Sequence, residues 1–155
     1  MSERTPRGIR NNNPLNIRRG KSAWMGLAER QTDSEFCVFK DARWGWRAAF
    51  KLLCDTYYNK WALRTVKSII STWAPPSDGN HTNLYVAQVA TAIGYSATQE
   101  LPPPSQNPSL WRRLGWAMAK VENGTLKNLR YEDMVIGFAL YVNPSTKMTY
   151  KRTDY

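Results

Sequence analysis

Apolar residues recur at helical spacing in five separate segments of this chain. The first pattern begins after Asp41, a side chain suited to an N-cap, and continues toward Tyr58. Two of the later patterns are followed by a residue that stops a helix: the second pattern by Pro75 and the third by Gly94. Beyond the first helix, the pattern predicts helices at about 65–73, 82–93, 109–121 and 131–142.

Two short apolar segments, Leu15–Arg18 and Phe36–Phe39, are instead typical of strands joined through a glycine-containing loop. We therefore predict a mainly α fold (α+β), a helical domain with a small β-hairpin at its edge. The length of 155 residues suits one domain over 1–155. Residues 1–10 and 144–155 are expected to be loosely ordered tails.

The composition indicates an anionic partner and leaves open the role of the many aromatic residues. Lys and Arg number 22 against 12 Asp and Glu, a net charge of +10 that attracts nucleic acid, anionic lipid or an acidic cell wall. The seven Trp and eight Tyr either line a binding groove or fill the core. No apolar run reaches the roughly 18–20 residues of a membrane helix, and Met1–Arg10 lacks the apolar centre of a signal peptide.

Metal and thiol chemistry find little support in the sequence. Cys37 and Cys54 stand among apolar residues, which predicts buried thiols rather than a disulfide. Two cysteines with the single histidine, His81, cannot frame a metal site, so no metal and no cofactor are expected.

Cleavage of a glycosidic bond requires a carboxylic acid, and Glu122 is the first candidate. It ends an apolar helix just before Gly124, where the negative end of the helix dipole and partial burial both favour the protonated form. The alternative is an exposed helix end in water. Asp78 is the second candidate, or else a cap for the next helix, and Glu35 is the third.

The motif from Arg7 to Arg18, RGIRNNNPLNIR, resembles a family of small phage and prophage proteins. Trp24-x-Gly26, Phe36-x-x-Phe39, Gly45-x-Arg47-Ala48 and the segment from Trp73 to Tyr85 add to this similarity, which spans about 7–141. Members are often labelled virion or structural proteins, and some are thought to be lysozyme-like. The resemblance implies a lysozyme-like domain.

A second resemblance concerns the segment Ala117–Gly124, which is similar to the helix end of lytic transglycosylases and implies Glu122 as the acid. Segments 13–17 and 36–48 resemble those that follow the catalytic Glu in flagellar-type glucosaminidases. Together these similarities imply a circularly permuted order. The chain departs from the transglycosylase pattern after Gly124, since no Gly-Leu-Met-Gln follows.

The hypothesis is cleavage of peptidoglycan between MurNAc and GlcNAc, by a lytic transglycosylase first and a muramidase second. The protein would be made in the cytoplasm and reach the wall after release, by injection or in a virion, with other virion proteins as partners. The alternative is a non-catalytic virion protein that binds DNA or another anionic surface. The expected substrate-binding residues are Asn11, Asn12, Asn13, Asn16, Arg18, Trp73, His81, Tyr85 and Asn123.

Overall fold

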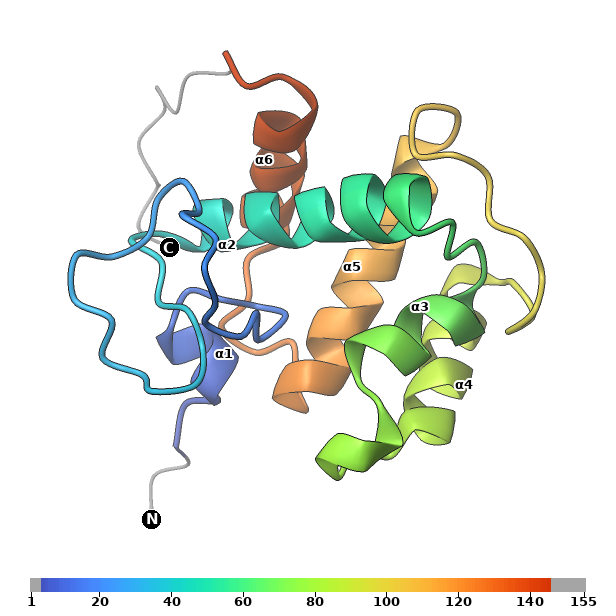
Figure 1. Cartoon of the computed structure of the whole chain (residues 1–155), viewed down its shortest axis with the longest axis horizontal. Helices are drawn as coiled ribbons and strands as arrows, with labels where there is room; N and C mark the ends of the chain where they lie inside the picture. The colour runs from blue at the N-terminus through green and yellow to red at the C-terminus, as the bar shows by residue number, and fades with distance from the viewer. Residues whose placement is uncertain (1–3, 146–155) are drawn as a thin grey trace.

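The computed structural model describes residues 4–145, and this part of the chain is mainly helical (Figure 1). The predicted fold class is thereby confirmed. The tail predictions for 1–3 and 146–155 lie outside the described residues. The elements are α1 (Arg7–Arg10), α2 (Ala42–Phe50), the π-helix η1 (Lys51–Lys60), α3 (Val66–Trp73), the 3₁₀-helix η2 (Pro76–Asp78), α4 (Thr82–Ile93), α5 (Pro108–Asn123) and α6 (Tyr131–Val142).

Helix ends follow the local signals in the sequence. The Asp41 carboxylate accepts the backbone N–H of Arg43, as predicted for an N-cap. Thr65 and Ser68 form a capping box at the start of α3. α4 and α5 each end at a glycine with positive φ, Gly94 and Gly124, where the absence of a side chain permits a left-handed residue. All five predicted helices are therefore present.

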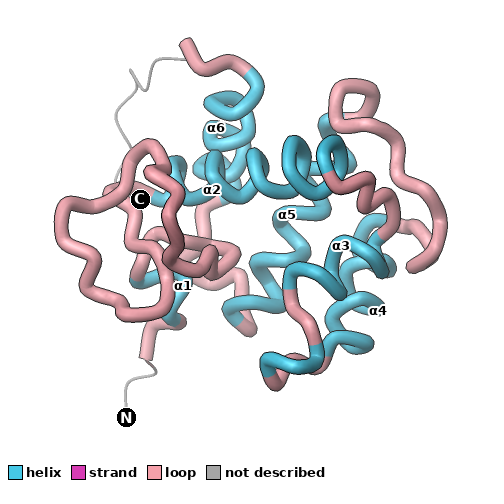
Figure 2. Tube along the Cα trace, viewed as in Figure 1, coloured by secondary structure: helices cyan, strands magenta, loops and turns pink. Residues whose placement is uncertain are grey.

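The predicted β-hairpin is wrong among the described residues. Its two segments contribute only isolated antiparallel bridges, Arg18 with Phe36 and Leu27 with Phe39, and Figure 2 shows the region as loop. The Asn13 side chain explains this, because its Nδ2 donates to the Cys37 carbonyl (2.9 Å) and its Oδ1 accepts from the Ile17 N–H (2.9 Å). A buried amide thus occupies an N–H and a carbonyl that could otherwise have paired with each other in a ladder, and only the bond from the Cys37 N–H to the Ile17 carbonyl remains between these two residues.

The prediction of a loose tail over 1–10 also fails at Arg7–Arg10, which forms the one-turn helix α1. Gly8 of this turn is buried, and a Cβ at that position would lie 2.6 Å from Oδ1 of Asn123. Only glycine allows so close an approach. α1 therefore rests on the C-terminal end of α5.

The core lies where α2 packs against α6. Trp46 is fully buried there, and a Cβ on Gly137 would come within 2.3 Å of the Trp46 Cβ. Cys37 and Cys54 are buried free thiols, as predicted. None of the described helices is both long and apolar enough to cross a membrane.

This arrangement brings the end of α5 between two groups of segments (Figure 1). On one side lies the N-terminal loop segment, residues 11–40, and on the other lie α3 and α4. α2 and η1 form one nearly continuous rod above both. Residues from distant parts of the sequence therefore meet around Glu122.

Candidate active site

A cleft of about 410 Å³ opens beside the end of α5. It is bordered by the N-terminal loop segment, by η1, by α3 with the turn that follows it, and by Glu122. Residues of both 11–18 and 75–81 contribute to it. The lining residues are Asn16, Ile17, Arg18, Gly20, Ser22, Trp24, Phe36, Leu52, Tyr57, Thr72, Trp73, Ala74, Pro75, Asp78, Asn80 and Glu122.

The Glu122 carboxyl is held by two side chains from other elements. Nδ2 of Asn16 donates to Oε1 and the Tyr85 hydroxyl donates to Oε2, each at 2.9 Å. Tyr85 itself is buried on α4. Both contacts bridge more than 30 residues of sequence, and they fix the carboxyl in one orientation.

Burial raises the pKa of the Glu122 carboxyl above its usual value. Donation by Asn16 and by Tyr85, and the positive charge of Arg18, act in the opposite direction without cancelling it. The raised pKa expected from the sequence is therefore found, with burial as its main cause. A carboxyl of this kind keeps its proton to higher pH than a solvated glutamate, as a general acid requires.

The surroundings of Glu122 can satisfy both protonation states. The Tyr85 hydroxyl lies 3.4 Å from the Met118 carbonyl as well as 2.9 Å from Glu122. When the carboxyl is protonated, Tyr85 can turn its proton toward Met118 and accept from Glu122. The Asn16 amide can likewise present its Oδ1, which is buried without a hydrogen-bond partner among the described residues, to the acid after a flip.

Asp78 lines the same cleft as Glu122 but is exposed on η2. The residue at the N-cap position of α4 is His81, and its side chain makes no capping hydrogen bond. A second carboxylate therefore faces the cleft from its solvent side.

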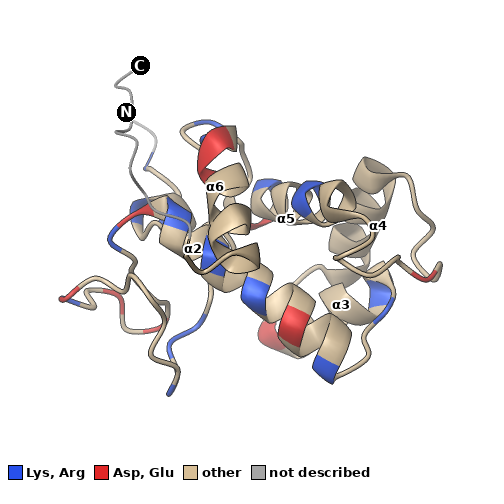
Figure 3. Cartoon of the chain, turned by 90° about the horizontal axis from the view of Figure 1, so that it is seen from above, with Lys and Arg blue, Asp and Glu red and all other residues tan. Residues whose placement is uncertain are grey.

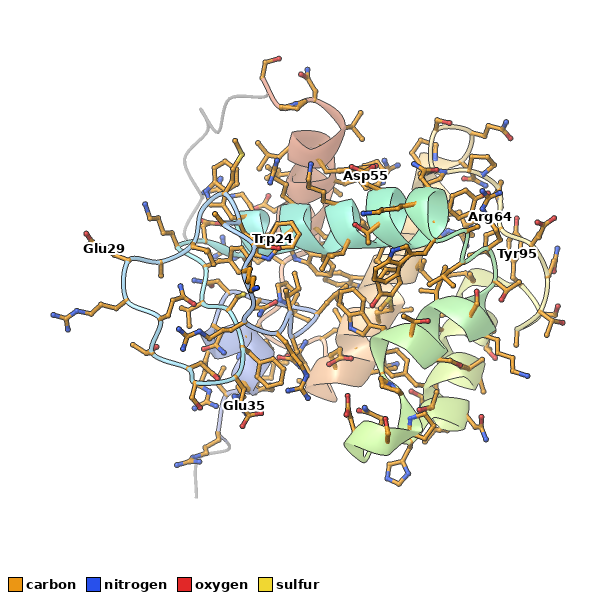
Figure 4. All side chains as sticks on the ribbon, in the orientation of Figure 1. Trp24, Glu29, Glu35, Asp55, Arg64 and Tyr95 are labelled. Atoms are coloured by element: carbon orange, nitrogen blue, oxygen red, sulfur yellow. The ribbon has the colours of Figure 1, made fainter. Side chains whose placement is uncertain are left out.

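Glu35, the third candidate acid, does not line the cleft. Its carboxylate is exposed and pairs with Arg7 at 3.8 Å and with Arg18 at 3.7 Å. Figure 4 shows it at the edge of the N-terminal loop segment. These contacts assign Glu35 to the charge network that orients Arg18.

Four asparagines predicted to bind substrate instead make hydrogen bonds inside the fold, three of them to backbone carbonyls and Asn11 to a carboxylate. Asn11 donates to Asp33, Asn12 to the Phe39 carbonyl, and Asn123 to the carbonyls of Pro14 and Ala119. Asn13, fully buried, bridges the two loop strands as described above. None of these four lines the cleft, because their amides are used inside the fold.

A second hollow of about 490 Å³ adjoins Glu122. His81 and Tyr85, both predicted to bind substrate, line it, and Asn80 and Glu122 line it together with the cleft. The carboxyl-bearing residue therefore stands where two hollows meet. A linear polymer could continue from one into the other across Glu122.

Three aromatic residues of the cleft, Trp24, Phe36 and Tyr57, were not among the predicted site residues. Trp24 belongs to the Trp24-x-Gly26 pattern, which was the available signal, and Figure 4 labels it on the N-terminal loop segment. Tyr57 lies on η1, where the sequence offers no mark that distinguishes it from core aromatics. Among the described residues, no three His, Cys, Asp or Glu side chains cluster as metal ligands.

Comparison with known proteins places the chain in a phage context. No protein-family model matches it. It is 36% identical over 135 residues to Protein P5 of Pseudoalteromonas phage PM2, and the alignment covers 85% of this chain and 79% of that protein. At this identity and coverage, the chain belongs to the family of that phage protein.

Proposed function

We propose that this protein cleaves the glycan strands of bacterial peptidoglycan, between MurNAc and GlcNAc, with Glu122 as the acid. The observation that carries the proposal is a half-buried carboxyl of raised pKa, oriented by Asn16 and Tyr85 at the edge of an open cleft. General acids of glycosidases have this combination of burial and access.

The cleft suits a sugar polymer in its other residues. Trp24, Tyr57 and Trp73 offer ring faces, while Asn16 and Asn80 offer amides to hydroxyl and acetamido groups. The second hollow gives the strand a path beyond Glu122. A polymer bound in both would place an internal bond at the carboxyl.

In the reaction, Glu122 gives its proton to the glycosidic oxygen as the bond from that oxygen to C1 breaks. The 6-hydroxyl of the same MurNAc then attacks C1, and its proton returns to the Glu122 carboxylate. This lytic transglycosylase step needs one carboxyl and leaves a 1,6-anhydro end. Asp78, across the cleft, supports the muramidase variant, in which it activates a water that attacks C1.

Membership in a phage protein family supports action on the wall of a bacterial host. Delivery would follow release from the infected cell, injection, or presence in the particle beside other virion proteins. The net charge of +10 also favours an anionic wall.

The test is cleavage of purified peptidoglycan by the wild type and by Glu122→Gln. Gln keeps the shape of Glu but holds no transferable proton, so we expect a loss of about 10²–10⁴-fold. Turbidity loss measures the rate, and mass spectrometry distinguishes anhydro ends from reducing ends.

Asp78→Asn and Glu35→Gln are the matched controls, each checked for an unchanged melting temperature. Asp78→Asn should preserve a transglycosylase and impair a muramidase, while Glu35→Gln should retain activity. Wild-type activity in Glu122→Gln would refute the assignment. An inactive wild type that binds DNA would favour the non-catalytic virion protein.

A further inference from the structure

An exposed tryptophan continues the aromatic wall of the cleft beyond the residues that line it. The Trp61 ring stacks on Tyr57, with centroids 5.1 Å apart and planes at 27°. Tyr57 in turn meets Trp73 edge-on, at 5.6 Å and 65°. Tyr57 and Trp73 line the cleft, and Trp61 does not. The three rings thus form a path from the cleft to the surface, here called the aromatic shelf.

Trp61 is not explained as a core residue. Its side chain is 51% exposed, which leaves much of the indole away from Tyr57 in contact with water. Exposing so large an apolar ring forgoes the stabilisation that burial would provide. A ring held open in this way is suited to stacking against a ligand.

The backbone holds Trp61 in place. Its N–H donates to the Thr56 carbonyl at 2.9 Å, and the N–H of Leu63 donates to the Tyr57 carbonyl at 2.9 Å. Ala62 between them has a φ of 55°, a left-handed conformation that is costly for any residue with a side chain. The strained residue thus lies in the turn that places the Trp61 indole beside Tyr57.

We propose that the aromatic shelf binds a pyranose ring of the same glycan strand, outside the cleft, with Trp61 as the contact residue. One face of a pyranose carries C–H groups and packs on an indole, while its hydroxyl edges stay in water. The ligand is therefore a neutral part of the strand, and affinity should increase with strand length. This inference rests on the proposed function.

The experiment measures binding of N-acetylglucosamine oligomers of two and of eight units by calorimetry. All variants carry Glu122→Gln, so that no oligomer is consumed. We expect Trp61→Ala to weaken binding of the octamer about tenfold and to leave the dimer unchanged. Trp61→Phe should retain most of the octamer affinity because it keeps a ring.

Tyr131→Ala is the matched control. Tyr131 is 52% exposed, packs edge-on against Trp116, and lines neither hollow beside Glu122. Its removal should not change octamer binding. Unchanged octamer binding by Trp61→Ala, an equal loss for dimer and octamer, or no octamer binding in the Glu122→Gln parent would overturn the inference. The proposed function is decided separately, by cleavage.

Discussion

The carboxyl of Glu122 combines two opposing influences at the scale of single residues. Burial raises its pKa, whereas the hydrogen bonds from Asn16 and Tyr85 lower it. Since both donors are neutral, they orient the group without neutralising it. The balance leaves an acid that is protonated over a wider pH range than a solvated glutamate.

Replacement of Tyr85 by Phe tests this balance. The hydroxyl stabilises the ionised carboxylate, so its loss should raise the pKa of Glu122 further. The proton then stays on the acid to higher pH, and the descending basic limb of the kcat/KM profile should move upward in pH. Tyr95 lines neither hollow beside Glu122, so Tyr95→Phe should leave the basic limb of the profile at the same pH. A basic limb that moved downward would contradict the role given to Tyr85.

At the scale of elements, the N-terminal loop segment is held by an ion pair where a β-hairpin was expected. Arg7 of α1 makes two hydrogen bonds to the Asp33 carboxylate, at 2.5 and 2.6 Å. The same carboxylate also accepts hydrogen bonds from Asn11 and from the backbone N–H groups of Glu35 and Phe36. Asp33 thus anchors the loop together with the two isolated bridges, a role that its polar sequence context did not indicate.

These contacts set a pH dependence of stability. Arg7 first, then Asn11 and the backbone donors, hold the pKa of Asp33 well below its usual value. A carboxyl with a lowered pKa stabilises the fold above its unfolded pKa of about 4, and this contribution is lost as the pH falls further. We expect the free energy of unfolding to fall between about pH 5 and 2 in the wild type and less steeply in Asp33→Asn. Arg7→Gln should flatten the slope as well, and an unchanged slope in both would refute the anchor.

The packing of α2 on α6 predicts a second effect on stability. A Cβ at Gly137 would lie 2.3 Å from the Trp46 Cβ and 2.8 Å from the Arg43 carbonyl, neither of which is a flexible side-chain end. Gly137→Ala should lower the free energy of unfolding, measured by urea denaturation, by about 1–3 kcal/mol, although alanine favours helices. A Cβ at Gly20 would have no neighbouring atom within 4 Å, so Gly20→Ala should change the free energy of unfolding by less than about 0.5 kcal/mol. Equal stability of the two variants would contradict this prediction, because it would mean that α6 can move away from α2 at no cost.

At the scale of the whole molecule, Lys and Arg residues are spread over helices and loops (Figure 3). A net charge of +10 attracts an anionic wall over distances that salt shortens to about 10 Å at 0.1 M. Raising NaCl from 50 to 300 mM should slow cleavage of intact walls several-fold. Binding of neutral N-acetylglucosamine oligomers by Glu122→Gln should change little. An equal salt effect on both would contradict an attraction between the net charge and the wall, because the oligomers are neutral.

The helices could be predicted from the sequence because their signals are local. Apolar spacing, the Asp41 cap and the glycines at 94 and 124 act within a few residues of the element they bound. Glu122 could be selected for the same reason, by its place at the end of an apolar helix. The absence of the hairpin could not be predicted from local signals, because strand pairing depends on whether the facing backbone groups are free to bond with each other.

Only the tertiary structure decided which polar residues face the cleft. Asn13 and Asn16 stand three positions apart in one motif, yet Asn13 is fully buried on backbone carbonyls and Asn16 holds Glu122. Tyr85 and Glu122 meet across 37 residues of sequence, a contact that no periodicity encodes. An amide or hydroxyl serves equally well inside a fold or at a site, and its role depends on the partner that the packing of distant elements brings within hydrogen-bonding distance.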